Sequence, residues 1–576
     1  MELSAIFHHP DKRFCYALAP GQFLLRIQAK ANDLRLVVLH TMDKYLPLSI
    51  ADTRQQQVME KVTTDGIHDY FEARISLDMV CLRYFFALTD RHGKTVYYGN
   101  YRFSPEEIRN IDDMFDCPQP LREEERFCIP DWAANKVVYQ IFPTRFASSR
   151  PVPDRIWYQA PIGPSTDLKG DLRGILSRLP YLRDLGVDVL YLTPIFQANS
   201  CHKYDTVDYF QVDSRLGTEE DLRQLVQQAH AMGMRVILDA VFNHTSRDFF
   251  AFRDILEKGE TSPYCSWYYI RSFPIRAERG EKPTYKTFSY YGGMPKLNLQ
   301  NPQVQEYVFQ VVRYWMRACQ IDGWRLDVGD EISHSFWKAF RKVVKAENPQ
   351  ALIAGEVWHY AGDFLEGDEW DTMMNYDFQG AVLGFVHGGP QAATQFVQRM
   401  GFLRGNAHTH VYPVLWNLID SHDTQRAMRS CGDNPDRFRL AAAMQLLSTG
   451  MPMIYYGDEY GLTGGNDPDC RRGMPWKPEK QNGDIFRWYQ TLIRLRKAHP
   501  VITQGRITAV YADDQKGILA ITREAEEEKM TLVFYNGSKP AACGIPQGRD
   551  LITGALFRGT LSPFQVLILS PADDST

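Results

Sequence analysis

Long apolar runs and paired cysteines are both missing from this sequence of 576 residues. No uninterrupted apolar run approaches the roughly 18 residues that a membrane-spanning helix needs. The first residues, MELSAIFHHPDKRF, contain no apolar core typical of a signal peptide. The ten cysteines are scattered and none forms a CxxC pair, which argues against a zinc site or a redox dithiol. These absences predict a protein of the reducing cytoplasm with no membrane partner.

A strong excess of charge is absent as well. The formal net charge is −5, which argues against a nucleic-acid-binding surface. Hydrophobic residues make up 44% and charged residues 23%, as in ordinary soluble globular proteins. Aromatic residues reach 13%, which fits either large cores or sugar-stacking surfaces. A chain of this length exceeds a single core and predicts two to four domains.

The two ends of the chain differ in pattern from its centre. Residues 1–120 contain short strand-like runs separated by Asp, Gly and Asn turns, which predicts a small β-sandwich. Residues 121–134 begin with the charge run LREEER and contain Pro130, which predicts a linker. Residues 505–576 return to strand-like runs such as KMTLVFYN and predict a second β-sandwich.

The central residues 135–504 alternate strand-like and helix-like segments. Strand-like examples are KVVYQIF, VDVLYLTPIF, MRVILDAVF and, later, MMNYDF. Eight such β/α units predict an α/β fold, a (β/α)8 TIM barrel, in which catalytic groups lie at the carboxyl ends of the strands. One connection, at about 245–300, is long, irregular and rich in Tyr, Phe and Pro. Connections of this kind are typical of lids or small inserted domains.

The run 323-GWRLDV-328 places two charged residues on one predicted strand. Side chains two residues apart on a strand share a face, so Arg325 and Asp327 are expected to lie together. A fixed guanidinium should keep Asp327 ionised. An ionised, oriented carboxylate at a strand end is a suitable nucleophile. A buried structural ion pair is the alternative interpretation of the same pattern.

Further stretches end apolar runs with carboxylates or histidines: 239-DAVFNH-244, 355-GEVWH-359 and 418-LIDSHD-423. In this order and spacing, the four stretches resemble the signature regions of the α-amylase superfamily, glycoside hydrolase family 13. A fifth stretch, 294-MPKLN-298, is similar to the form found in neopullulanases, cyclomaltodextrinases and maltogenic amylases. The resemblance covers nearly the whole chain. It implies a domain B at about 245–300 and a starch-binding-type N-terminal domain, through which the subfamily often forms homodimers.

The resemblance implies catalytic roles for three carboxyl groups. Asp327 would be the nucleophile and Glu356 the acid/base, while Asp423 would hold sugar hydroxyls and favour the distorted sugar ring. Apolar neighbours should raise the pKa of Glu356, as a general acid requires. An exposed glutamate at a helix start is the alternative. His244 and His422 would donate hydrogen bonds to the same sugar.

The resemblance also implies a set of sugar-binding side chains. Tyr204 would stack on the sugar at the point of cleavage, unless it is a core residue. Glu331 and Trp358 would lie on the acceptor side, although Trp358 also fits a packing position. Asp467 and Arg471 would bind a distal glucose or form a loop salt bridge. The complete predicted set is His202, Tyr204, His244, Arg325, Glu331, Trp358, His422, Asp467 and Arg471.

Candidate metal ligands are few. Relatives in this superfamily often bind calcium through an Asn/Asp-rich loop after the first strand and through a GGD turn. Here the turn reads Lys169-Gly170-Asp171, and the loop FASSRPVPDR offers only Asp154 as a strong oxygen donor. Calcium takes about six to eight oxygen ligands. We therefore expect no metal and no cofactor.

The combined expectation is a cytoplasmic, retaining α-glucan hydrolase that forms a homodimer through its N-terminal domain. It would cleave α-1,4 bonds of cyclodextrins, maltooligosaccharides or pullulan, and it would also transfer glycosyl groups. Two alternatives stay open. An α-1,6-glucosidase or a trehalose-active relative would keep the chemistry, although the MPKLN form argues against it. The other alternative is a non-catalytic carbohydrate-binding barrel. It is disfavoured because such a barrel would lack the catalytic carboxylates that this sequence contains.

Overall fold

The computed structural model describes residues 1–19, 21–45, 54–76, 81–117, 127–278, 281–526 and 528–571. The charge run at 121–126, within the predicted linker, lies outside the described residues. The chain divides into two compact units. The first comprises Met1–Cys128, Gly362–Asp368 and Gln395–Tyr412, and the second comprises Ile129–Ala361, Glu369–Thr394 and Pro413–Thr576.

The first unit is built on two antiparallel sheets, as its short strand-like runs separated by turns predict. One sheet has the strand order β1-β2-β6-β5, and the other has β4-β3-β7-β8-β9 with β10 paired to β7. Their apolar faces share one core, which includes Phe23, Val37 and Phe86. The strands are β1 (Cys15–Ala19), β2 (Gln22–Lys30), β3 (Leu34–Asp43), β4 (Gln55–Val58), β5 (Glu60–Thr64), β6 (His68–Ser76), β7 (Leu82–Asp90), β8 (Thr95–Gly99), β9 (Arg102–Ser104) and β10 (Phe115–Cys117).

The carboxyl end of α10 (Ala392–Asn406) belongs to this first unit. Arg26 of β2 is buried and binds Glu72 of β6 at 2.6 Å. The same guanidinium donates to the carbonyl oxygens of Gly405 and Ala407 at 2.8 and 3.1 Å. Carbonyl groups at the end of a helix lack partners within the helix. Arg26 therefore satisfies the end of α10 and ties it to the sheet.

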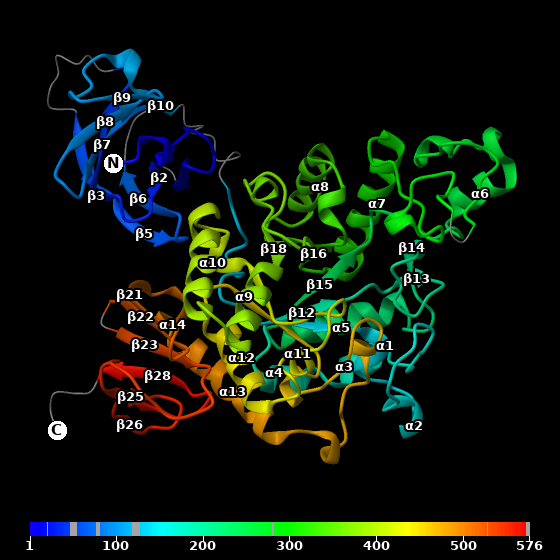
Figure 1. The fold of residues 1–576 in the computed structure, drawn as a ribbon. Helices are drawn as coiled ribbons and strands as arrows, with labels where there is room; N and C mark the ends of the chain where they lie inside the picture. Colours follow the sequence, from blue (N-terminus) through cyan, green and yellow to red (C-terminus); the bar gives the residue numbers. More distant parts are fainter. Residues whose placement is uncertain are drawn as a thin grey trace. The chain divides into compact units, whose positions relative to one another are not determined.

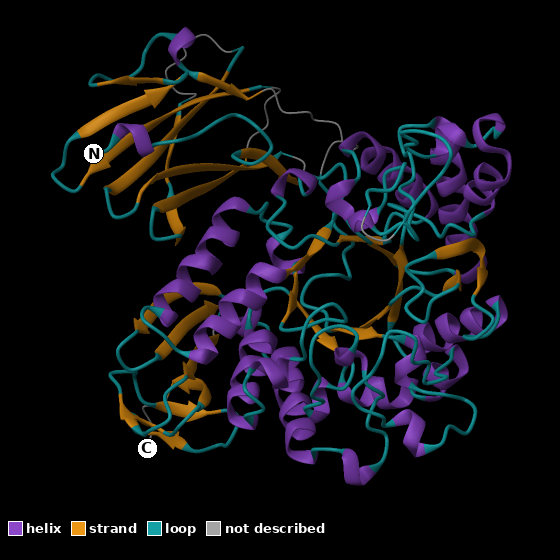
Figure 2. Cartoon of the chain, turned by 45° about the vertical axis from the view of Figure 1, so that its right-hand side comes forward, coloured by secondary structure: helices purple, strands orange, loops and turns teal. Residues whose placement is uncertain are grey.

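Eight parallel strands close into a barrel in the second unit, and Figure 2 shows them as a ring. Apolar side chains fill the interior, among them Val138, Ile237 and Trp416. The (β/α)8 barrel that the alternating pattern predicts is confirmed. Its strands are β11 (Val138–Ile141), β12 (Val189–Leu192), β15 (Arg235–Ala240), β16 (Gly323–Leu326), β17 (Leu352–Gly355), β18 (Thr372–Asn375), β19 (Trp416–Leu418) and β20 (Met451–Tyr455).

Helices join the barrel strands, as Figure 1 shows. Several of the long ones bury an apolar stripe, while α12 is buried on all sides from Leu440 to Leu447. In α7 the stripe runs from Val304 to Cys319 at intervals of three or four residues. α5 begins at a capping box formed by Thr218 and Asp221, and α4 ends at Gly186, whose φ is 97°. The helices are α1 (Pro143–Phe146), α2 (Asp154–Trp157), α3 (Leu172–Ser177), α4 (Leu179–Leu185), α5 (Glu219–Ala231), α7 (Pro302–Cys319), α8 (His334–Glu347), α9 (Tyr376–His387), α11 (Ala427–Ser430), α12 (Pro435–Leu447), α13 (Gly483–Ala498) and α14 (Val501–Gln504).

The predicted single strand VDVLYLTPIF is wrong in its length. β12 ends at Leu192, because Pro194 has no N–H to continue the ladder. A separate hairpin follows, in which β13 (Phe196–Ala198) pairs antiparallel with β14 (Thr206–Val212). The loop between these two strands carries Tyr204 and places it beside the barrel mouth.

The predicted strand MMNYDF is also too long. It ends at Asn375, which is the N-cap of α9. The Asn375 side chain accepts a hydrogen bond from the Phe378 N–H. An asparagine that caps a helix in this way stops the preceding strand.

The long connection after β15 forms a small inserted structure. It contains α6 (Phe250–Lys258), and single bridges join Tyr268 to Leu297 and His244 to Lys296. The bridges bring the 294–298 stretch back beside the end of β15.

The last part of the chain forms a six-stranded sheet of order β21-β22-β23-β28-β25-β26 and a two-stranded sheet, β24-β27. Within the described residues, no helix has the length and apolar character needed to cross a bilayer. The strands are β21 (Arg506–Asp513), β22 (Ile518–Ala525), β23 (Glu528–Tyr535), β24 (Ala541–Ala542), β25 (Gly548–Asp550), β26 (Leu556–Phe557), β27 (Thr560–Leu561) and β28 (Val566–Pro571).

Candidate active site

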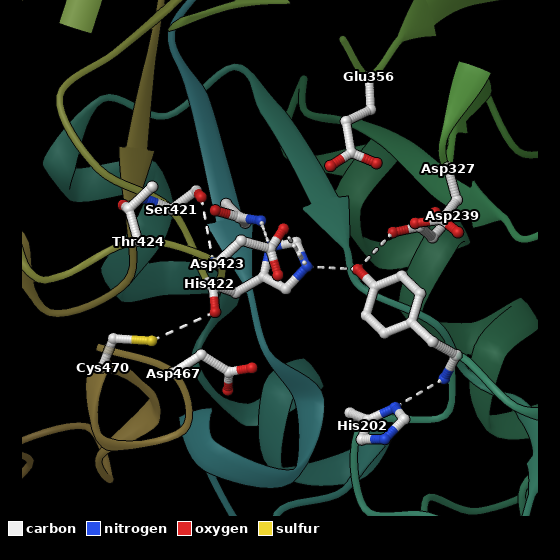
Figure 3. A network of polar contacts seen from close by, with 12 residues as sticks. His202, Asp239, Asp327, Glu356, Ser421, His422, Asp423, Thr424, Asp467 and Cys470 are labelled. Atoms are coloured by element: carbon white, nitrogen blue, oxygen red, sulfur yellow. Dashed lines mark hydrogen bonds and ion pairs between the residues drawn. The ribbon is translucent and has the colours of Figure 1, made fainter. Parts of the chain in front are cut away.

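Three neighbouring barrel strands bring two of the three predicted catalytic residues, Asp327 and Glu356, together. In the parallel ladder, Asp239 of β15 lies opposite Arg325 of β16, which lies opposite Ala354 of β17. Residues in register point to the same face of a sheet, and so do residues two apart on one strand. Asp327 and Glu356, two residues beyond Arg325 and Ala354, therefore enter the same space at the carboxyl ends of the strands (Figure 3).

Arg325 is the centre of this group and is fully buried. Its Nη1 donates to both carboxylate oxygens of Asp239 at 3.0 Å and to Oδ1 of Asp327 at 2.9 Å. Its Nη2 lies 2.7 Å from Oε2 of Glu356. Because both terminal nitrogens are bonded to one carbon, the carboxyl groups of Asp327 and Glu356 are held beside each other. Two adjacent carboxyl groups can act as a nucleophile and an acid/base pair.

Negative charge exceeds positive charge in this cluster, since three carboxyl groups surround one guanidinium. Burial raises the pKa of Asp327 well above its ordinary value, and Glu356 adds to the rise while Arg325 opposes it. Burial likewise raises the pKa of Asp239 to about 6, against the effect of Arg325. The interpretation that Arg325 alone sets the charge of Asp327 is therefore too simple. Neighbouring acids of this kind titrate as a coupled group that favours retention of a proton.

Further contacts fix the side chain of Glu356. The Val328 N–H donates to its Oε2 at 2.9 Å, and Trp358 Nε1 donates to its Oε1 at 3.3 Å. Val328 has φ 47° and ψ 47°, a left-handed conformation that β-branched residues rarely adopt. A Cβ at Gly355 would lie 2.2 Å from the Trp370 ring, so glycine is required directly before Glu356. Backbone strain of this kind persists where the surrounding fold enforces it and is typical of functional sites.

The loop after β19 supplies the third predicted carboxylate. His422 Nε2 lies 3.1 Å from Oδ2 of Asp423, and Arg471 Nη2 lies 3.3 Å from Oδ1. Arg471 also binds Asp467 at 2.8 Å, so the predicted pair is a direct ion pair. Burial raises the pKa of Asp423, and Arg471 opposes the rise. Figure 3 shows Asp423 and Asp467 on the left of the group and Asp327 on the right.

Tyr204 connects the two sides of the site. Its hydroxyl lies 2.5 Å from Nε2 of His422 and donates to Oδ2 of Asp239 at 3.0 Å. Its ring stacks on His422 with 5.4 Å between centroids and 5° between planes. Gln140 Nε2 donates to His422 Nδ1 at 2.7 Å, which leaves the proton of the neutral imidazole on Nε2. A proton donor and an aromatic face therefore stand between the carboxyl groups.

The two remaining predicted histidines differ in their surroundings. Nε2 of His244 donates to the Tyr204 carbonyl at 3.1 Å, and Asn243 Nδ2 donates to its Nδ1 at 3.4 Å. The ring stacks on Phe288, and burial lowers the pKa of His244 to about 3. His244 thus supports the backbone of Tyr204 in this structure, where the sequence predicts a donor to a sugar. His202 is partly exposed and accepts from the Tyr204 N–H at 3.1 Å.

Trp358 forms an exposed edge of the site. Its side chain is 54% exposed, and its ring stacks on Tyr376 with 4.2 Å between centroids and 8° between planes. The aromatic backing holds the indole flat beside Glu356. A flat apolar surface in this position suits the apolar face of a sugar ring.

Glu331 is tied to the fifth sequence stretch. Lys296 Nζ lies 2.6 Å from Oε2 of Glu331 and donates to its backbone oxygen at 3.2 Å. Asn243 Nδ2 donates to the same carboxylate at 3.4 Å. The 294–298 stretch therefore contributes a charged side chain to this edge of the site.

The residues at the positions where relatives often bind calcium have protein partners. Asp171 accepts from the Gly174 N–H at 2.7 Å and caps α3, and it accepts from Ser149 Oγ at 2.7 Å. Asp154 pairs with Lys477. Across the described ranges, no three His, Cys, Asp or Glu side chains are grouped so as to hold a metal ion.

Several residues of the site are not singled out by the sequence. Asp239 opens the DAVFNH stretch, and an acid at the end of an apolar strand is a usable signal. Tyr191, whose hydroxyl donates to Oδ2 of Asp239 at 2.6 Å, and Gln140 are fully buried in apolar strands. A polar side chain in such a strand also indicates a polar interior partner. In the sequence, Lys296 stands out only as part of the 294-MPKLN-298 stretch. The left-handed backbone conformation of Val328 could not be predicted from the sequence, because valine rarely adopts it.

Comparison with known proteins identifies two family models and several relatives that this chain matches. The family model "Alpha amylase, catalytic domain" matches residues 140–505, and "Alpha amylase, N-terminal ig-like domain" matches residues 1–119. Neopullulanase 2 of Thermoactinomyces vulgaris is 40% identical, with 99% of each chain covered. A cyclomaltodextrinase of a Bacillus species is 40% identical over 93% of this chain and 96% of its own. A solved cyclomaltodextrinase structure aligns with a TM-score of 0.92 at 38% identity, over 99% of this chain and 100% of its own.

Proposed function

Because the chain belongs to the α-amylase family, glycoside hydrolase family 13, we propose that it hydrolyses α-1,4-glucosidic bonds of cyclodextrins, maltooligosaccharides or pullulan with retention of configuration. The observation that carries the proposal is the contact of Asp327 and Glu356 with the two terminal nitrogens of Arg325. Retention requires two carboxyl groups about 5–5.5 Å apart, and one shared guanidinium favours such a spacing. The relatives named neopullulanase and cyclomaltodextrinase support the substrate class.

In the first step, a carboxylate oxygen of Asp327 attacks the anomeric carbon while Glu356 donates its proton to the glycosidic oxygen. The bond to the leaving sugar breaks, and an ester forms between the retained sugar and Asp327. Asp327 loses its negative charge as Glu356 gains one. The net charge beside Arg325 therefore stays constant, which avoids an electrostatic penalty in this buried cluster.

In the second step, the Glu356 carboxylate accepts a proton from a water molecule that attacks the same carbon. The ester bond breaks, and Asp327 regains its charge. The Val328 N–H and the Trp358 indole hold the carboxylate of Glu356 in position for both steps. A sugar hydroxyl in place of water would give glycosyl transfer.

Residues around the carboxyl pair would orient the sugar. Asp423 and His422 present an acceptor and a donor for vicinal hydroxyls, and Tyr204 offers a ring face. Trp358 would stack on the sugar that leaves, and the Arg471 pair would contact the distal residue of the retained part. None of these steps requires a cofactor.

Product stereochemistry tests the proposal directly. We expect the first product released from β-cyclodextrin to be the α-anomer, followed by slow mutarotation, as recorded by proton NMR within the first minutes. Initial β-anomer would contradict a retaining mechanism at this site. Rates on β-cyclodextrin, pullulan, starch and isomaltose should be compared at equal concentration. A preference for isomaltose would favour the α-1,6-glucosidase alternative.

The pH dependence of the first step should report the raised pKa of Asp327. With α-maltosyl fluoride, whose leaving group needs no proton, kcat/KM for fluoride release depends on an ionised nucleophile. Activity is lost as pH falls through the pKa of Asp327, so the acid limb should lie above about pH 4. Glu356→Gln removes a negative neighbour, and the limb should move to lower pH. Glu331→Gln, which removes a paired and half-exposed acid, should leave the limb in place.

We further propose that the protein works in the cytoplasm as a homodimer formed through the N-terminal domain. The sequence has ten scattered cysteines and no CxxC pair, which fits a reducing compartment. The family model matched at residues 1–119 supports a separate domain available for this contact. Light scattering should give twice the mass of one chain, and a monomer at micromolar concentration would rule out a stable dimer.

A further inference from the structure

A row of aromatic side chains in successive contact joins α6, the part of the inserted structure that follows it, α7 and β14. Figure 1 labels α6, α7 and β14. Neighbouring rings have centroids 5.2–5.7 Å apart. Most contacts are edge-to-face, the favourable geometry for packed rings. The aromatic row consists of Phe250, Tyr264, Trp267, Tyr307, Phe210 and Tyr314.

The aromatic row is not closed off as a core. Phe250 and Tyr314, near its two ends, are 38% and 37% exposed. Between them a groove of about 470 Å³ opens over Trp267 and Tyr307. Trp267 is 7% exposed and forms the buried floor of the groove, while the other five rings are at least partly exposed. Partly exposed aromatic surface gathered around a groove is typical of a binding site, because it is costly to leave in water.

Polar side chains line the same groove at helical spacing. Gln303 and Gln310 each lie three or four residues from Glu306 and Tyr307, so the four share one face of α7. Trp267 Nε1 donates to Gln303 Oε1 at 3.1 Å, and Gln310 Nε2 donates to Glu306 Oε1 at 3.3 Å. Planar amides and a carboxylate beside an aromatic floor supply donors and acceptors for vicinal hydroxyl groups.

The floor of the groove is joined to the stretch that reaches the active site. The Asn298 N–H donates to the Trp267 carbonyl at 2.7 Å, and the next residue, Tyr268, bridges to Leu297. Lys296, beside Leu297, binds Glu331. The groove and the acceptor edge of the site are thus built on the same short segment.

We propose that this groove is a second α-glucan-binding site, which holds a distant part of the polymer that the barrel cleaves; the inference rests on the proposed function. The apolar face of glucose fits an aromatic floor, and its hydroxyls fit the amides of Gln303 and Gln310. Glu306 disfavours a nucleic acid, whose phosphates need basic partners. Gln303, Glu306 and Gln310 beside the groove disfavour a lipid chain, which offers them no hydrogen-bond partners.

Starch binding by a catalytically silent chain tests the groove without hydrolysis. In a Glu356→Gln background, migration through native gels containing soluble starch should be retarded. Adding Gln303→Ala with Gln310→Ala should raise the apparent Kd for starch about fivefold or more, since each lost hydrogen bond is worth about 1 kcal/mol. Tyr314→Ala should weaken binding in the same direction. Tyr511→Ala is the matched control, because Tyr511 on β21 is 39% exposed and outside the groove.

Unchanged retardation in both the double glutamine variant and Tyr314→Ala, with Tm values equal to the parent, would overturn the proposal. Activity supplies a second readout in the otherwise native chain. The double glutamine variant should lose about threefold or more in kcat/KM on starch and nothing on maltotriose, which is too short to span both sites. An equal loss on both substrates would indicate a structural effect and would also overturn it. If the native chain hydrolyses no glucan, the proposed function fails while gel retardation still decides the groove.

Discussion

Asp327→Asn is expected to lower kcat on cyclodextrins and maltooligosaccharides by about 10⁴-fold or more, because an amide cannot form the ester that carries the reaction. The substitution keeps the size of the side chain, and its oxygen can still accept from Arg325. It also removes one of three carboxyl groups that crowd a single guanidinium. Tm should therefore stay level or rise, which separates a chemical effect from unfolding.

Glu356→Gln should match this loss on glucans, yet retain the first step with α-maltosyl fluoride, since fluoride departs without a proton. Initial-rate kinetics and single-turnover fluoride release distinguish the two variants: the aspartate variant should be inactive with both substrates. Asp484→Asn, at a side chain 66% exposed on α13, is the control and should change nothing. Near-normal kcat in either active-site variant would remove the assignment of the nucleophile or of the acid/base.

Arg325→Leu is expected to lower both activity and stability. It leaves three buried carboxyl groups without their cation, and breaking a buried ion pair costs about 3–5 kcal/mol. The loss should depend on pH. The pKa of Asp239 is about 6 even beside Arg325, and without the cation the pKa values of Asp239 and Asp327 should rise further. Protonated acids need no counterion, so the Tm deficit should be large at pH 8 and smaller at pH 5.

Calorimetric Tm values for the parent and the variant at both pH values check this prediction. Arg317→Gln is the matched control, because Arg317 is 67% exposed and pairs with Glu347 on the surface. Such surface pairs are worth about 0–1 kcal/mol, and the control should show a small loss at either pH. A Tm deficit for Arg325→Leu that is equal at both pH values, or larger at pH 5, would show that charge balance is not what Arg325 provides.

The barrel and its reactive ends were predictable because their signals are local. An apolar run that ends in GWRLDV or LIDSHD marks both a buried strand and the polar group at its end, whatever surrounds it. The Asp239–Arg325 contact was not predictable in the same way, because it depends on the register between two strands far apart in sequence. The hairpin that carries Tyr204 was missed because Pro194 divides an apolar run that looks continuous. The position of His244 depends on the backbone of another loop.

The guanidinium of Arg325 on β16 contacts Asp239 of β15 and Glu356, which follows β17. Catalytic activity therefore requires that these three strands pair in the correct register. A slip of one residue between any two of these strands would turn the reactive groups to the outside of the ring. Chains with such a register error would then show no catalytic activity, even with native-like helix content. Recovered turnover after refolding should therefore count only molecules whose strands have closed in the right order.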